Sequence, residues 1–370
     1  MTRSCMTAVI TVAISWSTEG RSDDKPRLSP AEIAERLAPL AGADQALTER
    51  EKALLSDAAD GKFSRVSFAE AALLASGVRD DAKRAKYLQR IDDFEKDARR
   101  AVAKGDVFEK GEGLLKWLHA GPAKKYEPNQ DHLPDLLDDG KFNCVSITTC
   151  YAVLAQRLGL DVRGLLIQVH IWGIQYDGDK SKEVETTNAR GYDPQRKRNS
   201  RPREVGEFGI VAAVYRNQAT RLDKKERHAE ALRAAAFARA LDPSGASNIG
   251  DVERVFHNWH VLHTKKDRFN EAIGVLKLGL EMAPGNRKLV GDRRNTYALW
   301  AQSCRKQNEW EKAAEVLTKA AKEYVYWARH LEKQGDSTKA AEVLKNGADA
   351  FPKSAGIRSE RERLRKENAK

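Results

Sequence analysis

The chain has 370 residues, of which 41% are hydrophobic and 32% charged, with a formal net charge of +11. These values are typical of a helix-rich globular protein, and the length exceeds what one ordinary core supports, so we expect two or three domains. Lysine and arginine are interleaved with aspartate and glutamate along the whole chain. No basic stripe with interleaved aromatic residues stands out, so the composition favours acidic partners over nucleic acid.

The N-terminus resembles a short secretory signal. Arg3 precedes an apolar run from Ser4 to Trp16, and Ser15-Trp16-Ser17 is a small-x-small pattern suited to cleavage. The run is too short to cross a bilayer, and no other apolar run reaches that length, so no membrane span is expected. Export to the periplasm or cell envelope is the first expectation, with residues 1–25 as signal and linker. The alternative is a cytoplasmic protein with a frayed terminus or a misplaced start codon.

Residues 26–104 are expected to form a helical N-terminal region. The pattern is helical from Ala31 to Gly105, Ser67-Phe68-Ala69-Glu70 has the spacing of a capping box, and Asp80 to Ala103 is amphipathic. The following region, 105–207, opens with another amphipathic helix from Asp106 to His119. Three prolines then break the chain into turns before Cys144.

The pattern after this loop predicts a buried helix followed by two strands. Cys144 to Leu158 is an apolar helix that Gly159 ends. Val162 to Tyr176 alternates with a period of two, which predicts one strand with His170 and Trp172 on one face, and Leu165, Ile167 and Ile171 on the other. Asp177-Gly178 indicates a hairpin, and Glu183 to Thr187 is the second strand.

The hairpin fixes the relation between His170 and the acids of the second strand. With Asp177-Gly178 as a two-residue loop, His170 lies directly opposite Glu185 on one face. A register shift of two residues keeps the facing and makes the pair diagonal, whereas a shift of one breaks it. Glu183 has the same facing as Glu185 and is the alternative acid.

Residues 208–370 contain a degenerate repeat. An alanine marks each of four units, a tryptophan precedes three of these alanines by 13 residues, and a proline follows three of them by 12: Ala231, Ala272, Ala313 and Ala340; Trp259, Trp300 and Trp327; Pro243, Pro284 and Pro352. This pattern resembles tetratricopeptide repeats, which stack helix pairs into a solenoid. The alanines are 41, 41 and 27 residues apart, which predicts two long linkers and a short one in about four units.

Cys144, His170 and Glu185 are the candidate catalytic residues. A thiol at a helix start, an imidazole and a carboxylate supply a nucleophile, its base and the group that orients the base. The dipole and free N–H groups of the helix start, and an imidazolium at His170, would favour the thiolate. The backbone N–H of Cys144 would serve as an oxyanion donor. Each residue alone is more often structural, and it is their joint order that indicates catalysis.

This order resembles the transglutaminase-like superfamily of papain-related cysteine enzymes. In that family a cysteine opens the core helix, histidine follows on a strand, often as His-x-Trp, and an acid follows on the next strand. The match lies within residues 105–200, in Asn143-Cys144-Val145-Ser146, His170-Ile171-Trp172 and Val184-Glu185-Thr186-Thr187. The acid is Glu rather than the usual Asp. No residue clearly matches the oxyanion side chain that papain-like enzymes place before the cysteine; Asn143 and Gln168 are the candidates.

Other motifs are expected to be structural. Cys144 and Cys150 point in different directions on one helix and are not expected to form a disulfide. His257, His260 and His263 have helical spacing, but no nearby carboxylate or cysteine in the sequence completes a metal site, so no metal or other cofactor is expected. The basic run from Arg196 to Arg203 is a solvated loop or attracts acidic substrate segments.

The sequence thus predicts an α+β protein with a helical N-terminal region, a small transglutaminase-like core with an antiparallel sheet, and a C-terminal α-solenoid. The resemblance implies attack of Cys144 on an amide bond of a protein or peptide. Water would resolve the thioester in a peptidase or amidase, and an amine in a cross-linking enzyme. The repeats would bind a protein partner. The alternative is a catalytically inactive core in a repeat scaffold.

Overall fold

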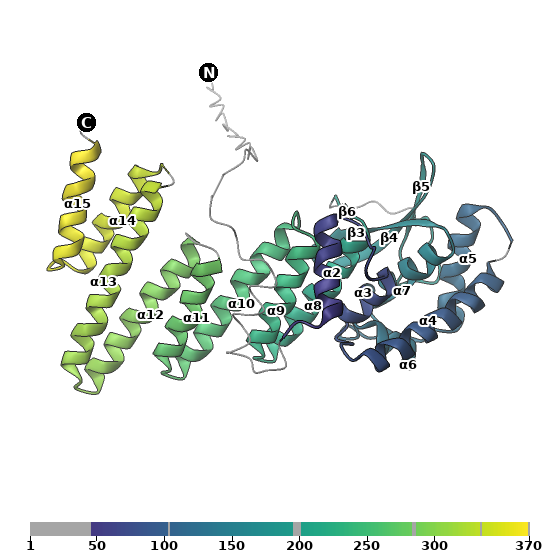
Figure 1. Ribbon diagram of the computed structural model, residues 1–370, viewed down its shortest axis with the longest axis horizontal. Coiled ribbons are helices and arrows are strands. Elements are labelled where there is room, and N and C mark those ends of the chain that lie inside the picture. Colours follow the sequence, from purple (N-terminus) through teal and green to yellow (C-terminus); the bar gives the residue numbers. More distant parts are fainter. Residues whose placement is uncertain (1–45, 103, 195–200, 283–285, 334, 369–370) are drawn as a thin grey trace, which may run out of the picture.

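Helices make up most of the described residues, and one small antiparallel sheet lies toward the end of the elongated molecule that is opposite the C-terminus (Figure 1). The computed structural model describes residues 46–368 except 103, 195–200, 283–285 and 334. In this part of the chain the α+β class is confirmed, with a four-stranded sheet and a C-terminal stack of helices. The expected signal segment and residues 196–200 of the basic run lie outside the described residues.

Side chains that cap their first turns define the four N-terminal helices, which are α2 (Glu49–Asp60), α3 (Phe68–Ala75), α4 (Asp81–Ala101) and α5 (Val107–Ala120). Ser67 caps α3 as the sequence predicts. Glu70 does not complete a capping box, because its carboxylate accepts a hydrogen bond from the buried Arg84 at 3.1 Å. Full capping boxes instead start α2 and α5.

The proline-rich loop contains structure that the sequence did not predict. The short strands β1 (Lys125–Tyr126) and β2 (Lys141–Phe142) pair in parallel, and the helix α6 (Leu133–Asp139) lies between them in the chain. Pro134 occupies the first turn of α6, where its missing N–H costs nothing. The helix α7 (Cys144–Arg157) follows β2 directly and starts at the predicted cysteine.

The sheet has the order β5-β4-β3-β6. Its strands are β3 (Asp161–Ile167), β4 (His170–Asp177), β5 (Lys180–Val184) and β6 (Arg203–Val205). The prediction of one strand from 162 to 176 is wrong, because the chain turns at Gln168-Val169 and Ile167 pairs with His170. Leu165 therefore pairs with Trp172 and shares its face, contrary to prediction.

The hairpin between β4 and β5 differs from the expected one by a shift of its loop. The loop residues are Gly178 and Asp179, and Asp177 pairs with Lys180. This displaces the second strand by two residues, so His170 and Glu185 keep the same facing but are diagonal rather than directly opposed. Strand β5 ends at Val184, so Glu185 follows the strand instead of lying within it.

Eight helices form the C-terminal helical stack: α8 (Glu207–Lys224), α9 (His228–Leu241), α10 (Ala246–Lys265), α11 (Phe269–Met282), α12 (Arg287–Lys306), α13 (Trp310–Lys333), α14 (Ser337–Ala350) and α15 (Ala355–Asn368). Consecutive helices pack side by side away from the sheet (Figure 1). The four repeat alanines lie on α9, α11, α13 and α14, and all are buried. Their small side chains let neighbouring helices approach closely.

The irregular repeat spacing has a different cause from the predicted short linker. The single long helix α13 carries both Ala313, which belongs to the third unit, and Trp327, which opens the fourth. One helix thus serves two units, and no loop separates them. None of the described helices combines the length and the apolar character that crossing a membrane requires.

The hydrophobic core is continuous from the N-terminal helices into the helical stack. One cluster of buried residues extends from Leu54 in α2 through α7 and the sheet to Val290 in α12. Smaller clusters hold α12 to α13 and α13 to α14 and α15. The sheet and the first helices of the stack therefore share one core, and the last helices have their own.

Burial of Ala313 gives a test of the packing in the stack. Ala313→Leu is expected to lower the free energy of unfolding by about 1–3 kcal/mol, because Ala313 is buried and its packed surroundings leave no room for a larger side chain. Ala314→Leu, at the exposed neighbouring position on the same helix, is expected to change it by less than about 0.5 kcal/mol. Urea denaturation of both variants measures the difference, and equal effects would contradict this packing.

Candidate active site

The three candidate catalytic residues lie at the ends of three different elements. Cys144 is the first residue of α7, His170 is the first residue of β4, and Glu185 directly follows β5. Each position is set by a local signal: the cap of a helix, the turn before a strand and the end of a strand. The structure brings the side chains of all three together.

His170 and Glu185 form a hydrogen-bonded pair. Nε2 of His170 lies 2.9 Å from Oε2 of Glu185, whose side chain is almost fully buried. The other carboxylate oxygen of Glu185 accepts a hydrogen bond from the Thr187 hydroxyl at 2.8 Å. Burial alone would raise the pKa of Glu185, but the hydrogen bond and charge of His170, with the bonds from Thr187, lower it below its usual value. Glu185 is therefore a carboxylate that orients the ring.

His170 also interacts with the Cys144 thiol. This hydrogen-bonding interaction is the largest effect that raises the pKa of His170 to about 9, and the hydrogen bond to Glu185 is the next. Burial opposes both effects. Nε2 is occupied by Glu185, so Nδ1 is the ring nitrogen left for the thiol. At neutral pH His170 is therefore an imidazolium beside the Cys144 side chain.

Glu183, the alternative acid, has another role. Its Oε2 accepts a hydrogen bond from the indole N–H of Trp172 at 3.1 Å. The Trp172 ring stacks on His170 with 5.4 Å between ring centroids and an interplanar angle of 24°. Glu183 therefore bonds to the Trp172 ring that stacks on His170, whereas Glu185 bonds to His170 itself.

Thr148 joins the three segments that carry the candidate catalytic residues. It lies on α7 one turn after Cys144 and is fully buried. Its hydroxyl donates to the carbonyl of Ile171 at 3.2 Å and lies 2.6 Å from the hydroxyl of Thr186. Ile171 and Thr186 are the residues that follow His170 and Glu185. One buried hydroxyl therefore links the helix of Cys144 to the residues that follow His170 and Glu185.

The loop after Glu185 closes tightly. The N–H of Glu185 donates to the carbonyl of Gly191 at 2.7 Å. A Cβ atom on Gly191 would lie only 2.0 Å from the Glu185 carbonyl oxygen, so only glycine fits here. This closure holds the acid at the end of β5 in spite of the irregular chain that follows.

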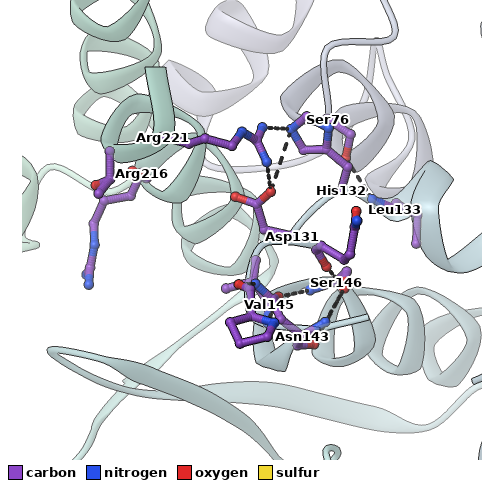
Figure 2. A network of polar contacts seen from close by, with 12 residues as sticks. Ser76, Asp131, His132, Leu133, Asn143, Val145, Ser146, Arg216 and Arg221 are labelled. Carbon is purple, nitrogen blue, oxygen red and sulfur yellow. Dashed lines mark hydrogen bonds and ion pairs between the residues drawn. The ribbon is translucent and has the colours of Figure 1, made fainter. Parts of the chain in front are cut away.

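Asn143, a candidate for the oxyanion side chain, caps α7. Its Oδ1 accepts hydrogen bonds from the N–H groups of Val145 and Ser146, and its Nδ2 donates to the Pro128 carbonyl at 2.9 Å. Figure 2 shows these contacts at the helix start. The cap leaves the N–H of Cys144 as the first-turn donor without a partner among the described residues.

Two arginines of α8 hold the loops on either side of the site. Arg221 bonds to Asp131 and His132 in the loop before α6, and Arg216 donates to the carbonyl of Gln168 in the turn before His170. Figure 2 shows both arginines on one helix, with Asp131 between Arg221 and the start of α7. Burial, then the charge of Arg221, lowers the pKa of His132 to about 4, so its neutral ring accepts from Arg221.

Gln168, the other oxyanion candidate, has an exposed side chain at the tip of the β3–β4 turn. Sequence reasoning missed Tyr126, whose ring packs edge-on against Phe142 at 5.8 Å, two residues before the thiol. Burial, followed by the charges of Cys144 and Glu185, raises the pKa of Tyr126, so the phenol stays protonated and can donate. Its position upstream of the cysteine is the signal that could have indicated it.

The remaining cysteines with described positions take no part in this site. Cys150 and Cys304 are free and buried, as expected for structural thiols. Burial raises the pKa of Cys150 to about 12, so it is a neutral thiol at physiological pH. Cys144 and Cys150 do not form a disulfide, as predicted. Arg203, at the end of the basic run, is paired with Asp242.

The contacts of Thr148 give a test with a matched control. Thr148→Val keeps the shape and removes two hydrogen bonds, so the rate of Cys144 alkylation by iodoacetamide is expected to fall about tenfold. Thr149→Val removes one bond within the helix, to the Val145 carbonyl, and is expected to leave the rate nearly unchanged. Mass spectrometry of the alkylated peptide measures the rates. Equal rates for both variants would show that Thr148 does not position the site.

The charge of His170 gives a second test. Its pKa is expected near 9 in the native protein and closer to 6.5 in Cys144→Ala and Glu185→Gln, which each remove a group that stabilises the imidazolium. NMR titration of the ring measures these values, with Cys150→Ala as control. The raised pKa also contributes stability that is complete below about pH 6.5 and is lost as pH rises through about 9. An unchanged His170 pKa in both variants would contradict this geometry.

Comparison with known proteins found neither a matching family model nor a curated protein of similar sequence. The case for a function therefore rests on the arrangement of Cys144, His170 and Glu185.

Proposed function

We propose that this chain is a transglutaminase-like cysteine enzyme that attacks amide bonds of a protein or peptide and forms a thioester. The observation that supports this most is the meeting of Cys144, His170 and Glu185 from three separate elements. A structural role alone would not require a thiol, a charged imidazole and a buried carboxylate in this order. Cys150 on the same helix provides the contrast, because it is buried and neutral.

The first step uses the thiolate and the imidazolium together. Sγ of Cys144 attacks the carbonyl carbon of the amide, and the π electrons move to the carbonyl oxygen. His170 then gives its proton to the amide nitrogen as the C–N bond breaks, so an amine leaves and a thioester remains. Glu185 keeps the ring oriented and stabilises its charge without taking the proton.

The oxyanion is stabilised at the start of α7. The Asn143 side chain accepts hydrogen bonds from the N–H groups of Val145 and Ser146, so the Cys144 N–H remains available as a donor. The helix start also carries a partial positive charge, which favours an oxyanion there. Tyr126 is our candidate for a second donor, in place of Asn143 and Gln168. Tyr126 lies on β1, next to Phe142 of the paired strand β2. It comes before the cysteine in the chain, as the papain-related pattern requires.

The thioester is resolved by water or by an amine. In either case His170, now neutral, takes a proton from the nucleophile as it attacks the thioester carbonyl, and the thiolate leaves. Water gives a carboxylic acid, as in a peptidase or amidase, and an amine gives a new amide, as in a cross-linking enzyme. Both outcomes restore the starting ion pair.

The C-terminal helical stack is proposed to act as tetratricopeptide-like repeats that bind a protein partner. A cavity of about 780 Å³ lies where the first helices of the stack meet α2, α3 and the loop before α6. Basic side chains outnumber acidic ones along its wall, among them Arg79, Arg221, Lys224, Lys225, Arg227 and Arg233. This surplus favours an acidic segment of the partner or substrate. Arg221, in the same wall, bonds to Asp131 of the loop before α6.

The proposal is tested by labelling with a thiol-reactive probe that mimics an amide. The native protein is expected to react at Cys144, and Cys144→Ala is expected to lose the label while it stays folded by circular dichroism. His170→Ala is expected to slow labelling by about a hundredfold or more, because it removes the imidazolium that favours the thiolate. Cys304→Ala is the control and should react like the native protein, because this thiol is buried.

Equal labelling of Cys144→Ala and the native chain would contradict the proposal. So would a Cys144 that reacts no faster than an ordinary exposed thiol. The alternative, an inactive core in a repeat scaffold, would then remain, and the full-length Cys144→Ala chain should capture the same partner as the native chain.

A further inference from the structure

Two histidines of α10 and one aspartate of α12 converge in the C-terminal helical stack. His257 and His260 lie one turn apart on α10, and Asp292 lies in the second turn of α12. One ligand atom from each of the three lies within 4.8 Å of the others. The sequence alone pointed to His257, His260 and His263 and to no carboxylate. In the folded chain the third member of the group is Asp292 and not His263, and Asp292 is more than thirty residues away in the sequence.

The three side chains are only partly satisfied by one another. Nδ1 of His257 lies 2.7 Å from Oδ2 of Asp292, at hydrogen-bond distance. Nδ1 of His260 lies 4.0 Å from the same oxygen, which is beyond that distance. This nitrogen of His260 is buried and has no hydrogen-bond partner in the described part of the chain. A buried imidazole nitrogen without a hydrogen bond is unusual, because buried polar groups are normally bonded.

The carboxylate also lacks an ordinary countercharge. Among the ion pairs of the described residues, Asp292 is joined to these two histidines and to no lysine or arginine. The next residue, Arg293, is paired with Glu323 of α13 instead. The Asp292 side chain is only 15% exposed. A mostly buried carboxylate without a nearby cation is costly, and a divalent ion would lower that cost.

We propose that His257, His260 and Asp292 form a binding site for a divalent transition metal, with Zn²⁺ as the ion that fits best. Two imidazoles and one carboxylate are a common zinc ligand set, and three protein ligands leave a further position for water or another ligand. Tetrahedral Zn²⁺ at about 2.0–2.2 Å from each ligand requires ligand atoms about 3.3 Å apart. The His257–Asp292 pair would open slightly, and His260 would close in.

The site joins two units of the stack. His257 and His260 come from the helix that precedes Ala272 of one unit, and Asp292 comes from the corresponding helix of the next. A bound ion would cross-link α10 to α12 and stabilise the folded stack by an amount that increases with the logarithm of the free ion concentration above its Kd. This inference is independent of the proposed catalysis, since none of its ligands belongs to the site at Cys144.

The test uses the full-length chain without an affinity tag, after treatment with a chelator. Cys144→Ser serves as the parent protein, because the Cys144–His170 pair could itself bind Zn²⁺. Calorimetric titration is expected to show one Zn²⁺ per chain. Co²⁺ in its place should give the visible absorption of a site with nitrogen and oxygen ligands. The melting temperature should rise with Zn²⁺ concentration.

Variants of the ligands decide the result. Asp292→Asn keeps a hydrogen-bond acceptor for His257 and removes the carboxylate, and His260→Ala removes the second imidazole; each is expected to weaken Zn²⁺ binding at least about tenfold. His263→Ala, one turn further along α10, is the matched control and should bind like the parent. If the parent binds no Zn²⁺, or if Asp292→Asn and the parent bind it equally, the three residues are only an interhelical hydrogen-bond cluster. Because Asp292→Asn preserves the hydrogen bond, a folding defect in His260→Ala leaves the test intact.

Discussion

The arrangement of Cys144, His170 and Glu185 depends on one buried hydroxyl. Thr148 bonds to the residues that follow His170 and Glu185, and it stands one helical turn from Cys144. A hydrogen bond between buried groups has a narrow range of distance and angle, so it fixes position more sharply than apolar packing does. The relative placement of helix, strand and loop is therefore set in the core, and this placement determines where Cys144, His170 and Glu185 lie.

The first helix of the stack extends this constraint to the rest of the molecule. Arg221 of α8 holds the loop before α6, and Arg216 holds the turn that leads to His170. The loop before α6 also contacts the start of α7, because Ser146 donates to the carbonyl of Gln130. The same helix contributes to the continuous core that includes α7. One helix thus contacts the segments next to Cys144 and next to His170.

Some of these features could be predicted from the sequence because local rules decide them. Asn143 before an apolar run starts α7 at Cys144, and the two-residue period of a strand gives His170 and Glu185 a common facing even though the hairpin loop moved by one position. The turn at Gln168-Val169 escaped prediction because neither residue favours a turn and the alternation continues through it. Tyr126 and Asp292 escaped for another reason. Their relevance depends on contacts between distant segments, which spacing along one element does not reveal.

The long helix α13 has a consequence for how the protein comes apart. Its first half packs in a cluster with α12, and its second half packs in another with α14 and α15. Opening the final hairpin exposes the last cluster and removes Phe351 from the cluster of α12 and α13, but it leaves the core around Cys144 intact. The rate of amide hydrogen exchange should therefore decrease along the molecule, with the C-terminal helices opening first and the sheet last. Local unfolding then takes place far from Cys144.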